Sequence, residues 1–319
     1  MSSPPDNPQM TPVKLSIIIV SYNCQSYLIG CIKSIFEARL PFAYEIIVVD
    51  NASSDAGSEL VSREFPAITI IQNSDNVGFA QANNQGILRA SGECVLFLNN
   101  DTVVRAGSIE AMVKRLEEDR TLGAVGCALE DGEGELQVSF GGMLNFTNEF
   151  FQKYFSKIVF KLRRRVFGLR VFYPHWVSGA FLLARRSVLV DVGMLDENFF
   201  MYTEEVDLCE RIRNRGLRIC YDPEWRIVHF GGKSTGMNRL KADTEYRWSQ
   251  LYFYSKHYSQ TRAHILKLYL LLKTGARYLW ALITKEDPER IHLRHKVFST
   301  VWEYDLSNHK NPRQAAKKE

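Results

Sequence analysis

The feature that most constrains the fold is a short apolar run, residues 95–98, that ends abruptly in Asn99, Asn100 and Asp101. Unbroken apolar runs of this length are typical of strands in the middle of a parallel sheet, where both faces are covered. Ligands of open α/β sheets bind at the carboxyl ends of the strands. We therefore expect these three polar side chains to face a ligand, although an ordinary turn after a strand also favours Asn and Asp.

Three earlier apolar runs, at residues 15–20, 44–49 and 68–72, are each followed by a helical pattern. Strands and helices that alternate at this spacing predict an α/β fold with a doubly wound, mainly parallel sheet. In such a sheet the strands end along a common edge. The first two runs end in polar residues that would share this edge: Ser21, Tyr22, Asn23, Asp50 and Asn51.

The side chains expected at this edge suit a nucleotide. Tyr22 could stack on a base, and Asp50 and Asn51 could hydrogen-bond a base or a ribose. Asn83, early in the next helical pattern, could reach a ribose or a phosphate. Polar loops are common, but four polar strand ends in succession favour a nucleotide site. The absence of GxGxxG after the first strand and of GxxxxGK[ST] argues against a dinucleotide Rossmann site and a P-loop.

Acidic residues cluster at the start of another helical pattern, residues 203–216. Thr203 is a good N-cap, and Glu204, Glu205 and Asp207 follow it. The helix dipole favours carboxylates at this position, so capping alone is an alternative explanation. Three carboxylates directly after an aromatic-rich loop exceed what capping requires, and we interpret them as part of a site.

A histidine, His229, ends a later apolar strand pattern just before a glycine-rich stretch. A lone histidine is more often a core or surface residue than a ligand. In a chain that also has an aspartate at a strand end, Asp101, this histidine is a candidate ligand for a divalent metal.

The net charge of +4 conceals two basic segments in an otherwise slightly acidic chain. Residues 152–170 hold seven Lys/Arg and no Asp/Glu, and residues 261–319 hold 12 Lys/Arg and six Asp/Glu. Such local segments argue against a general nucleic-acid surface. Apolar side chains at helical spacing in 155–169 and aromatic and leucine side chains in 262–285 predict helices on an anionic membrane surface. For the first segment, a core helix with a solvated basic face is the alternative.

These patterns divide the chain into a disordered lead (1–12), a main domain (13–240) with a basic amphipathic insertion (151–172), a C-terminal helical membrane-surface segment (241–306) and a disordered tail (307–319). The lead lacks the features of a signal peptide, and no stretch has the ~18 uncharged apolar residues of a membrane span. The six scattered cysteines are expected to be reduced. We therefore expect a cytoplasmic protein, peripheral at the inner face of the plasma membrane.

Seven motifs occur in one order: SIIIVSYN, VVDNASSD, NVGFAQANNQG, FLNNDT, SGAFLLARR, LDENFFMYTEEVDLCERIRNRG and VHFGG. Together they resemble a family 2 glycosyltransferase of the GT-A fold, close to the bacterial rhamnosyltransferase-like group. The resemblance covers roughly residues 15–232. It implies an inverting, metal-dependent transfer of a sugar, with rhamnose as a candidate, from a nucleoside-diphosphate sugar to a hydroxyl of a saccharide acceptor. The acceptor would be lipid-linked, as in the assembly of bacterial cell-surface polysaccharides.

The resemblance also implies roles for individual residues. The triplet at 99–101 stands where the family has an Asp-x-Asp motif, so Asp101 would hold Mg²⁺ or Mn²⁺ together with His229. Glu204 and Glu205 match an acidic pair whose second member is the general base, which assigns that role to Glu205. The expected acceptor-binding residues are Trp176, Gly179, Glu204 and Asp207. The expected donor-binding residues are Ser21, Tyr22, Asn23, Asp50, Asn51, Asn83, Asn99 and Asn100.

Two other classes of protein remain open at this point. A sugar-nucleotide nucleotidyltransferase shares the sheet architecture but normally begins with a Gly-rich, Arg/Lys-containing loop, which residues 21–24 do not resemble. A catalytically weak glycan-binding relative is the second alternative. Asn99, in place of an acid, favours this second class, whereas Asp101, Glu205 and His229 argue against it.

Overall fold

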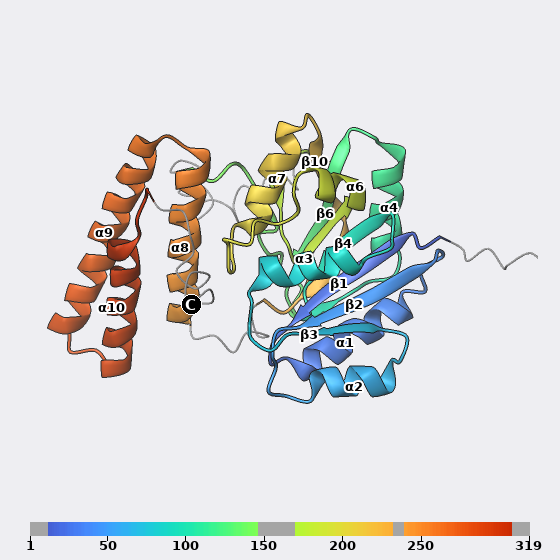
Figure 1. The fold of residues 1–319 in the computed structure, drawn as a ribbon, viewed down its shortest axis with the longest axis horizontal. Coiled ribbons are helices and arrows are strands. Elements are labelled where there is room, and N and C mark those ends of the chain that lie inside the picture. Colours follow the sequence, from blue (N-terminus) through green and yellow to red (C-terminus); the bar gives the residue numbers. More distant parts are fainter. Residues whose placement is uncertain (1–11, 146–169, 232–238, 308–319) are drawn as a thin grey trace, which may run out of the picture.

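The structure is a computed structural model that describes residues 12–145, 170–231 and 239–307 (Figure 1). The predicted disordered ends, except for Pro12 and Ser307, and the basic amphipathic helix expected at 155–169 lie outside the described residues. The other predicted segments can be compared with the structure element by element.

An eight-stranded sheet forms the centre of the protein, with the strand order β3-β2-β1-β4-β9-β6-β10-β5. Parallel pairs join β1 to β2 and β4, β2 to β3, and β6 to β10. Two strands run against this direction: β9, which lies between β4 and β6, and β5, at the edge beside β10. The strands are β1 (Leu15–Ser21), β2 (Tyr44–Asp50), β3 (Thr69–Gln72), β4 (Cys94–Leu98), β5 (Thr102–Val103), β6 (Leu122–Glu130), β9 (Phe181–Arg185) and β10 (Arg218–His229).

Helices cover both faces of the sheet, as the doubly wound prediction requires (Figure 1). Side chains of α1 (Gln25–Glu37), α2 (Gly57–Glu64) and α4 (Ser108–Glu118) pack in one core. Those of α3 (Phe79–Arg89), α6 (Arg186–Asp191) and α7 (Glu204–Asn214) pack in a second core. Because side chains alternate along a strand, Ile17 and Ile19 of β1 enter the first core and Ile18 the second. This explains why β1 and β4 read as continuous apolar runs.

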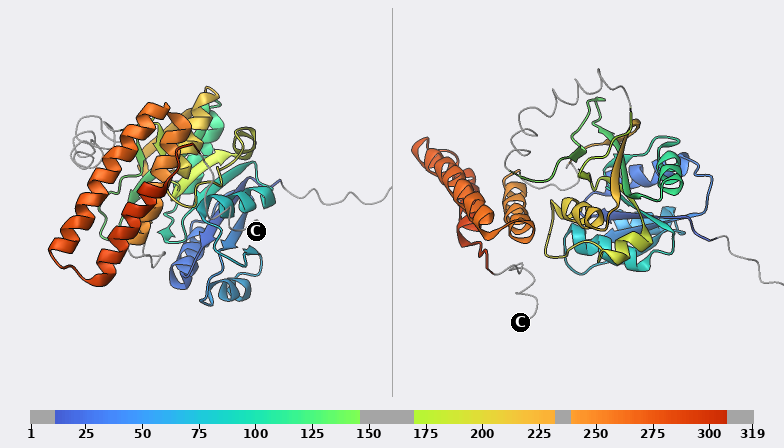
Figure 2. Two further views of the ribbon diagram at one scale, coloured as in Figure 1. Left: turned by 60° about the vertical axis from the view of Figure 1, so that its left-hand side comes forward. Right: turned by 90° about the horizontal axis from the view of Figure 1, so that it is seen from above.

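Three helices follow the sheet domain: α8 (Arg239–His257), α9 (Gln260–Ile283) and α10 (Pro288–Glu303). Their buried side chains form a third core, which also contains Phe199 and Val206 from the segment around the start of α7. Figure 1 and the right-hand view of Figure 2 agree that α8 lies between the sheet domain and the other two helices. A short ribbon of β7 (Phe140–Gly141) and β8 (Trp176–Val177) completes the fold.

Five of the six cysteines, all except Cys24, are free thiols buried in the first two of these cores, and Cys24 is buried outside them. In the part of the chain that the structure describes, no helix is both long enough and apolar enough to cross a bilayer.

Candidate active site

A cavity of about 270 Å³ opens at the carboxyl ends of β1, β2 and β4, beside the start of α7. Seven separate stretches of the chain contribute to its wall, which explains why no single motif defines it. Eight of the residues predicted from the sequence line it: Tyr22, Asn51, Asn99, Asn100, Gly179, Glu204, Glu205 and His229.

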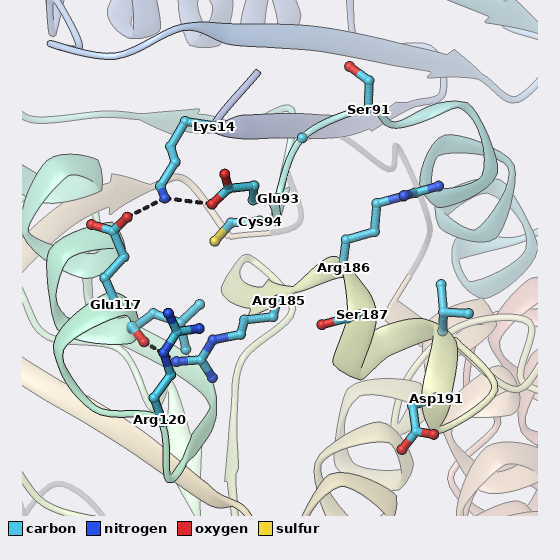
Figure 3. Close-up of a pocket in the computed structure, with 13 residues that line it drawn as sticks. Lys14, Ser91, Glu93, Cys94, Glu117, Arg120, Arg185, Arg186, Ser187 and Asp191 are labelled. Atoms are coloured by element: carbon cyan, nitrogen blue, oxygen red, sulfur yellow. Dashed lines mark hydrogen bonds and ion pairs between the residues drawn. The ribbon is translucent and has the colours of Figure 1, made fainter. Parts of the chain in front are cut away.

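A larger cavity, about 810 Å³, lies at the other end of the sheet, where β1 and β4 begin (Figure 3). Its charged side chains are largely engaged with neighbouring protein groups. Lys14 pairs with Glu93 and Glu117, and the guanidinium of Arg185 donates to the backbone carbonyls at the end of α4, including that of Asp119. The smaller cavity, which combines polar strand ends with buried acids, is therefore the candidate active site.

Asn51, directly after β2, shows how this wall of the cavity is held in place. Its side-chain amide nitrogen donates to the backbone carbonyl of Gly78 at 3.2 Å, and its side-chain oxygen accepts from the side chain of Asn73 at 2.9 Å. Gly78 has a φ of +90°, and a Cβ at this position would lie 2.6 Å from the carbonyl oxygen of Phe200. The backbone amide of the following residue, Phe79, donates to this carbonyl oxygen of Phe200 at 2.7 Å. A glycine at position 78 thus lets the backbone before α3 approach the backbone at Phe200 closely.

Asp50, Asn23, Ser21 and Asn83 do not line the cavity. Asp50 accepts hydrogen bonds from Ser53, Ser58 and Gln72. Burial acts to raise the pKa of Asp50, but these hydrogen bonds outweigh burial and hold the pKa below its ordinary value.

The other three residues also make hydrogen bonds to groups of the protein itself. The side-chain oxygen of Asn23 accepts from Ser54, the carbonyl of Ser21 accepts from Asn51, and the amide of Asn83 donates to the Phe79 carbonyl. All four residues therefore make hydrogen bonds to other parts of the protein, and Asn23 does so at the surface.

Nine lining residues were not predicted from the sequence, among them Asn76 and Gly78, which belong to the loop before α3 because this helix begins at Phe79 and not at Asn76. The missed residues are Val20, Asn76, Gly78, Phe79, Ser178, Ala180, Phe200, Met201 and Tyr202. An available signal was the glycine within the motif NVGF, since a glycine between a polar loop and a helix often marks a close backbone approach.

Thr203 occupies the N-cap position of α7, as predicted, but its side chain makes no capping hydrogen bond. Both Tyr202 and Thr203 have positive φ values, 72° and 65°. Residues other than glycine rarely adopt positive φ values, and such backbone strain persists only where the surrounding structure imposes it. Here α8 supplies the support: the Thr203 hydroxyl donates to the carbonyl of Ser249 at 3.5 Å, and the Ser249 hydroxyl donates to the carbonyl of Met201 at 2.7 Å.

Glu204 and Glu205 form the acidic wall of the cavity. Burial raises the pKa of Glu205 to about 7, against hydrogen bonds from backbone amides of its own turn that lower it. Burial also raises the pKa of Glu204 well above its ordinary value, and the neighbouring charge of Glu205 adds to this effect. A carboxyl group with a pKa near neutrality is suited to accept a proton.

Asp207 lies on the other side of the same helical turn and does not reach the cavity, so the structure gives no support to its predicted contact with an acceptor. Its fully buried carboxylate bonds His257 at 2.7 Å, Lys256 at 2.7 Å and Arg211 at 2.8 Å. Burial acts to raise its pKa, but the His257 hydrogen bond and the Arg211 and Lys256 charges outweigh burial and lower the pKa to about 2. Asp207 therefore fastens α7 to α8.

Asp101 is buried outside the cavity lining, and it lies beside His229 because β5 pairs with β10, with Thr102 opposite His229. The Asp101 Oδ1 atom is 3.4 Å from His229 Nε2, and the amide nitrogen of Asn99 is 3.2 Å from the same Nε2. A carboxylate and an imidazole this close suit a divalent metal such as Mn²⁺. Within the described residues, no cluster of three or more His, Cys, Asp or Glu side chains could hold a metal by itself. A metal bound here would therefore need ligands in addition to these two side chains.

The remaining two predicted acceptor residues differ in position. Gly179 lines the cavity, and a Cβ on it would lie 3.4 Å from the Phe79 ring and 3.7 Å from the Cβ of Glu205. Trp176 lies outside the lining, where its indole nitrogen donates to the carbonyl of Gly142 at 2.9 Å. Glycine at position 179 thus keeps the cavity open next to Glu205.

Solved structures share this architecture. A mannosyltransferase, PcManGT from Pyrobaculum calidifontis in complex with GDP-Man and Mn²⁺, aligns with a TM-score of 0.55 over 95% of this chain and 92% of that chain, at 18% identity. GalNAc-T7 with UDP, GalNAc and Mn²⁺ aligns with a TM-score of 0.52 over 77% of this chain and 51% of that chain, at 15% identity. The fold is that of the GT-A glycosyltransferases.

The sequence model of the family described as Glycosyl transferase family 2 matches residues 16–189, more than half of the chain. The chain belongs to this family and is a glycosyltransferase, so the nucleotidyltransferase alternative is set aside. Its curated relatives include rhamnosyltransferases. The N-acetylglucosaminyl-diphospho-decaprenol L-rhamnosyltransferase of Mycobacterium tuberculosis (strain ATCC 25618 / H37Rv) is 28% identical over 71% of this chain and 79% of its own length. Rhamnosyltransferase WbbL of Escherichia coli (strain K12) is 25% identical over 73% and 88%.

Proposed function

We propose that this glycosyltransferase transfers a sugar, with rhamnose as the first candidate, from a nucleoside-diphosphate donor to a saccharide hydroxyl with inversion at the anomeric carbon. The observation that carries the proposal is the composition of one small cavity. Glu205, with a pKa near neutrality, lines it together with Asn99, Asn100 and His229 at the strand ends. The names of the rhamnosyltransferase relatives support the choice of sugar.

Glu205 acts as the general base in this proposal. With a pKa raised to about 7, its carboxylate form is accessible near neutral pH, and a carboxylate can accept the proton of an acceptor hydroxyl as that oxygen attacks the sugar. One base and one direct displacement lead to inversion. Glu204, on the same turn and also facing the cavity, holds the acceptor. Tyr22 and Asn51, which line the cavity at the ends of β1 and β2, hold the nucleotide.

Asp101 and His229 would hold Mg²⁺ or Mn²⁺, and the solved mannosyltransferase with GDP-Man and Mn²⁺ supports this choice of metal. A cation bound between them would neutralise the charge that develops on the departing nucleoside diphosphate. Asn99 stands where the family has the first acid of its Asp-x-Asp motif, so Asp101 would supply the carboxylate of this motif.

A donor screen by thermal shift, with and without Mn²⁺, tests the donor and the metal together. The expected result is a rise in melting temperature with one nucleoside-diphosphate sugar that requires Mn²⁺ in the wild type and is absent in Asp101→Ala. The matched control is Asp131→Ala, which changes an aspartate in an exposed turn. Normal turnover of Asp101→Ala in the presence of EDTA would overturn the metal proposal.

The acceptor is proposed to be a lipid-linked saccharide, and α9 is proposed to lie on an anionic membrane surface. The sequence of α9 contains four Lys/Arg and no Asp/Glu. Its exposed face is apolar for most of its length, with exposed fractions of 59% for Leu268, 67% for Leu272, 64% for Trp280 and 75% for Ile283. An apolar stripe flanked by basic residues is typical of helices that lie in the membrane interface. The name of the mycobacterial relative supports a lipid-linked acceptor.

Sedimentation with liposomes tests this surface. The wild type is expected to sediment with vesicles that contain anionic lipid and much less with neutral vesicles, and Leu272→Glu is expected to remain in solution. Leu88→Glu is the matched control, because Leu88 is 71% exposed on α3, in the sheet domain. Equal and negligible binding of the wild type to anionic and neutral vesicles at low salt would contradict the proposal.

A further inference from the structure

A glutamine outside the cavity wall, Gln137, makes two hydrogen bonds to the same residue, His229. The His229 Nδ1 atom is 2.7 Å from Gln137 Oε1, and Gln137 Nε2 donates to the His229 backbone carbonyl at 2.6 Å. Its own backbone amide donates to the carbonyl of Leu129 at 2.8 Å, which fixes Gln137 beside β6. Because β6 pairs with β10, the glutamine is held by the same sheet as the histidine.

The two bonds determine which nitrogen of His229 carries the proton. A backbone carbonyl can only accept, so the NH₂ group of the Gln137 amide must face it. The amide oxygen must then face Nδ1, and a close contact between them requires a hydrogen on Nδ1. In the neutral ring the remaining nitrogen, Nε2, has the lone pair, and it faces Asp101 and Asn99. A nitrogen with a free lone pair is what a metal ligand requires.

Two neighbouring residues agree with this arrangement. The amide nitrogen of Asn99 lies 3.2 Å from Nε2, as expected for a donor that faces a lone pair. Gly231 has a φ of +71°, and a Cβ at this position would lie 3.3 Å from Gln137 Nε2. Glycine at this position therefore leaves room for the glutamine amide to reach the His229 carbonyl.

We infer that Gln137 is a positioning residue that sets the tautomer and orientation of His229 for binding a divalent cation. The inference rests on the proposed metal site but concerns a different residue and a property of the protein without metal. Outer-shell partners of this kind typically change metal affinity by about 10- to 100-fold when they are removed.

The test compares Gln137→Met, which keeps the length of the side chain, with Gln137→Glu, which keeps an acceptor for Nδ1–H. Nitrogen-15 NMR of labelled histidine at pH 8 reports the tautomer, and the signal of His229 is assigned by its loss in His229→Asn. The wild type and Gln137→Glu are expected to show hydrogen on Nδ1. Gln137→Met is expected to shift the ring toward hydrogen on Nε2.

Binding of Mn²⁺ alone, followed by water-proton relaxation, provides the second measurement. Gln137→Met is expected to weaken Mn²⁺ binding by about tenfold or more. Gln85→Met serves as the control, because Gln85 is another half-buried glutamine whose amide bonds a different residue, Asn73. An unchanged tautomer and unchanged Mn²⁺ affinity in Gln137→Met, with weakened binding in His229→Asn, would overturn the inference and leave the metal site standing. Unchanged Mn²⁺ binding in His229→Asn would instead remove the metal site, and the NMR measurement would still decide whether Gln137 sets the tautomer.

Discussion

The two sides of the first turn of α7 hold carboxylates in opposite states. On the cavity side, Glu205 has a pKa raised to about 7, and on the α8 side Asp207 has a pKa lowered to about 2. Burial acts in the same direction on both groups, so burial cannot account for the difference. What differs is the set of partners: Asp207 has Arg211, Lys256 and His257, and no cation is paired with Glu205 in the described residues.

The comparison shows how one short sequence, Glu-Glu-Val-Asp, supplies both a reactive group and its support. The polarity of the three acids does not distinguish their roles, and neither does the helix dipole, which acts on all of them. Partners from α8, about fifty residues later in the chain, make the distinction. Pairs of acids whose environments push their pKa values apart are typical of acid–base sites.

The largest expected effect comes from the cavity side. Glu205→Gln keeps the shape of the side chain and removes its basicity, so the turnover number should fall by about 10²- to 10⁴-fold. Donor affinity should change little, because the donor is proposed to be held by other residues, Tyr22, Asn51 and the metal site. Steady-state kinetics and donor titration check both. Glu204→Gln is the matched control and should mainly raise the Michaelis constant for the acceptor; a fully active Glu205→Gln with an inactive Glu204→Gln would reverse the assignment.

The next effect comes from the α8 side. Asp207→Asn leaves Arg211 and Lys256 without their shared buried carboxylate, and breaking a buried ion pair in this way typically costs about 3 kcal/mol or more. Urea denaturation at neutral pH should show this loss. Asp191→Asn is the control, because Asp191 pairs with Arg215 at the surface, where both side chains are more than half exposed. Equal stability of the two variants would show that α8 does not support the turn.

The pH dependence of the wild type sharpens the contrast. Glu205 must be ionised to accept a proton, so the ratio kcat/KM should fall about tenfold per pH unit below its pKa of about 7 and level off above it. Asp207, with its pKa near 2, stays ionised throughout this range and should not contribute. Initial rates from pH 5 to 9 at fixed ionic strength check this expectation. A flat profile below pH 7 in the wild type, or a fall that persists unchanged in Glu205→Gln, would exclude Glu205 as the titrating group.

The smallest expected effect concerns stability on the cavity side. The pKa of Glu204 is raised in the folded protein, so at a pH well above the ordinary glutamate pKa the unfolded chain gains more free energy from ionising this group than the folded protein does. Glu204→Gln should therefore increase the free energy of unfolding by about 1 kcal/mol at pH 8, within the usual range for relieving a functional strain. The gain should vanish near pH 4, where the carboxyl group is protonated in both states. Denaturant titrations at the two pH values provide the measurement.

Much of the fold could be predicted because its strands are buried on both faces. The runs that became β1, β2 and β4 are continuous and apolar, and the polar residues after them mark the edge where the cavity lies. The antiparallel direction of β9 could not be read from its sequence, because FLLAR has the same pattern in either direction. Pairing with β4 and β6 decides its direction, and such pairing leaves no local signal.

The site was harder to predict wherever a polar side chain bonds the protein itself. Asn83 and Asp50 look in sequence like ligands of a nucleotide, yet the structure uses the first to bond its own helix and the second to hold a loop. Asp101, Glu205 and His229 were easier, because their motifs tie them to strand and helix ends. The bond from Gln137 to His229 spans 92 residues and had no signal in the sequence.

The position of β10 has a consequence for how much of the chain can be produced as a stable unit. The family match ends at residue 189, but β10 begins at Arg218 and pairs along almost the whole of β6. A chain that ended at the boundary of the match would leave β6, nine residues of mostly apolar sequence, as an open edge with unpaired backbone groups. Long apolar edges recruit strands from other molecules and lead to aggregation. Solubility of the domain thus depends on the same strand that presents His229 to the cavity.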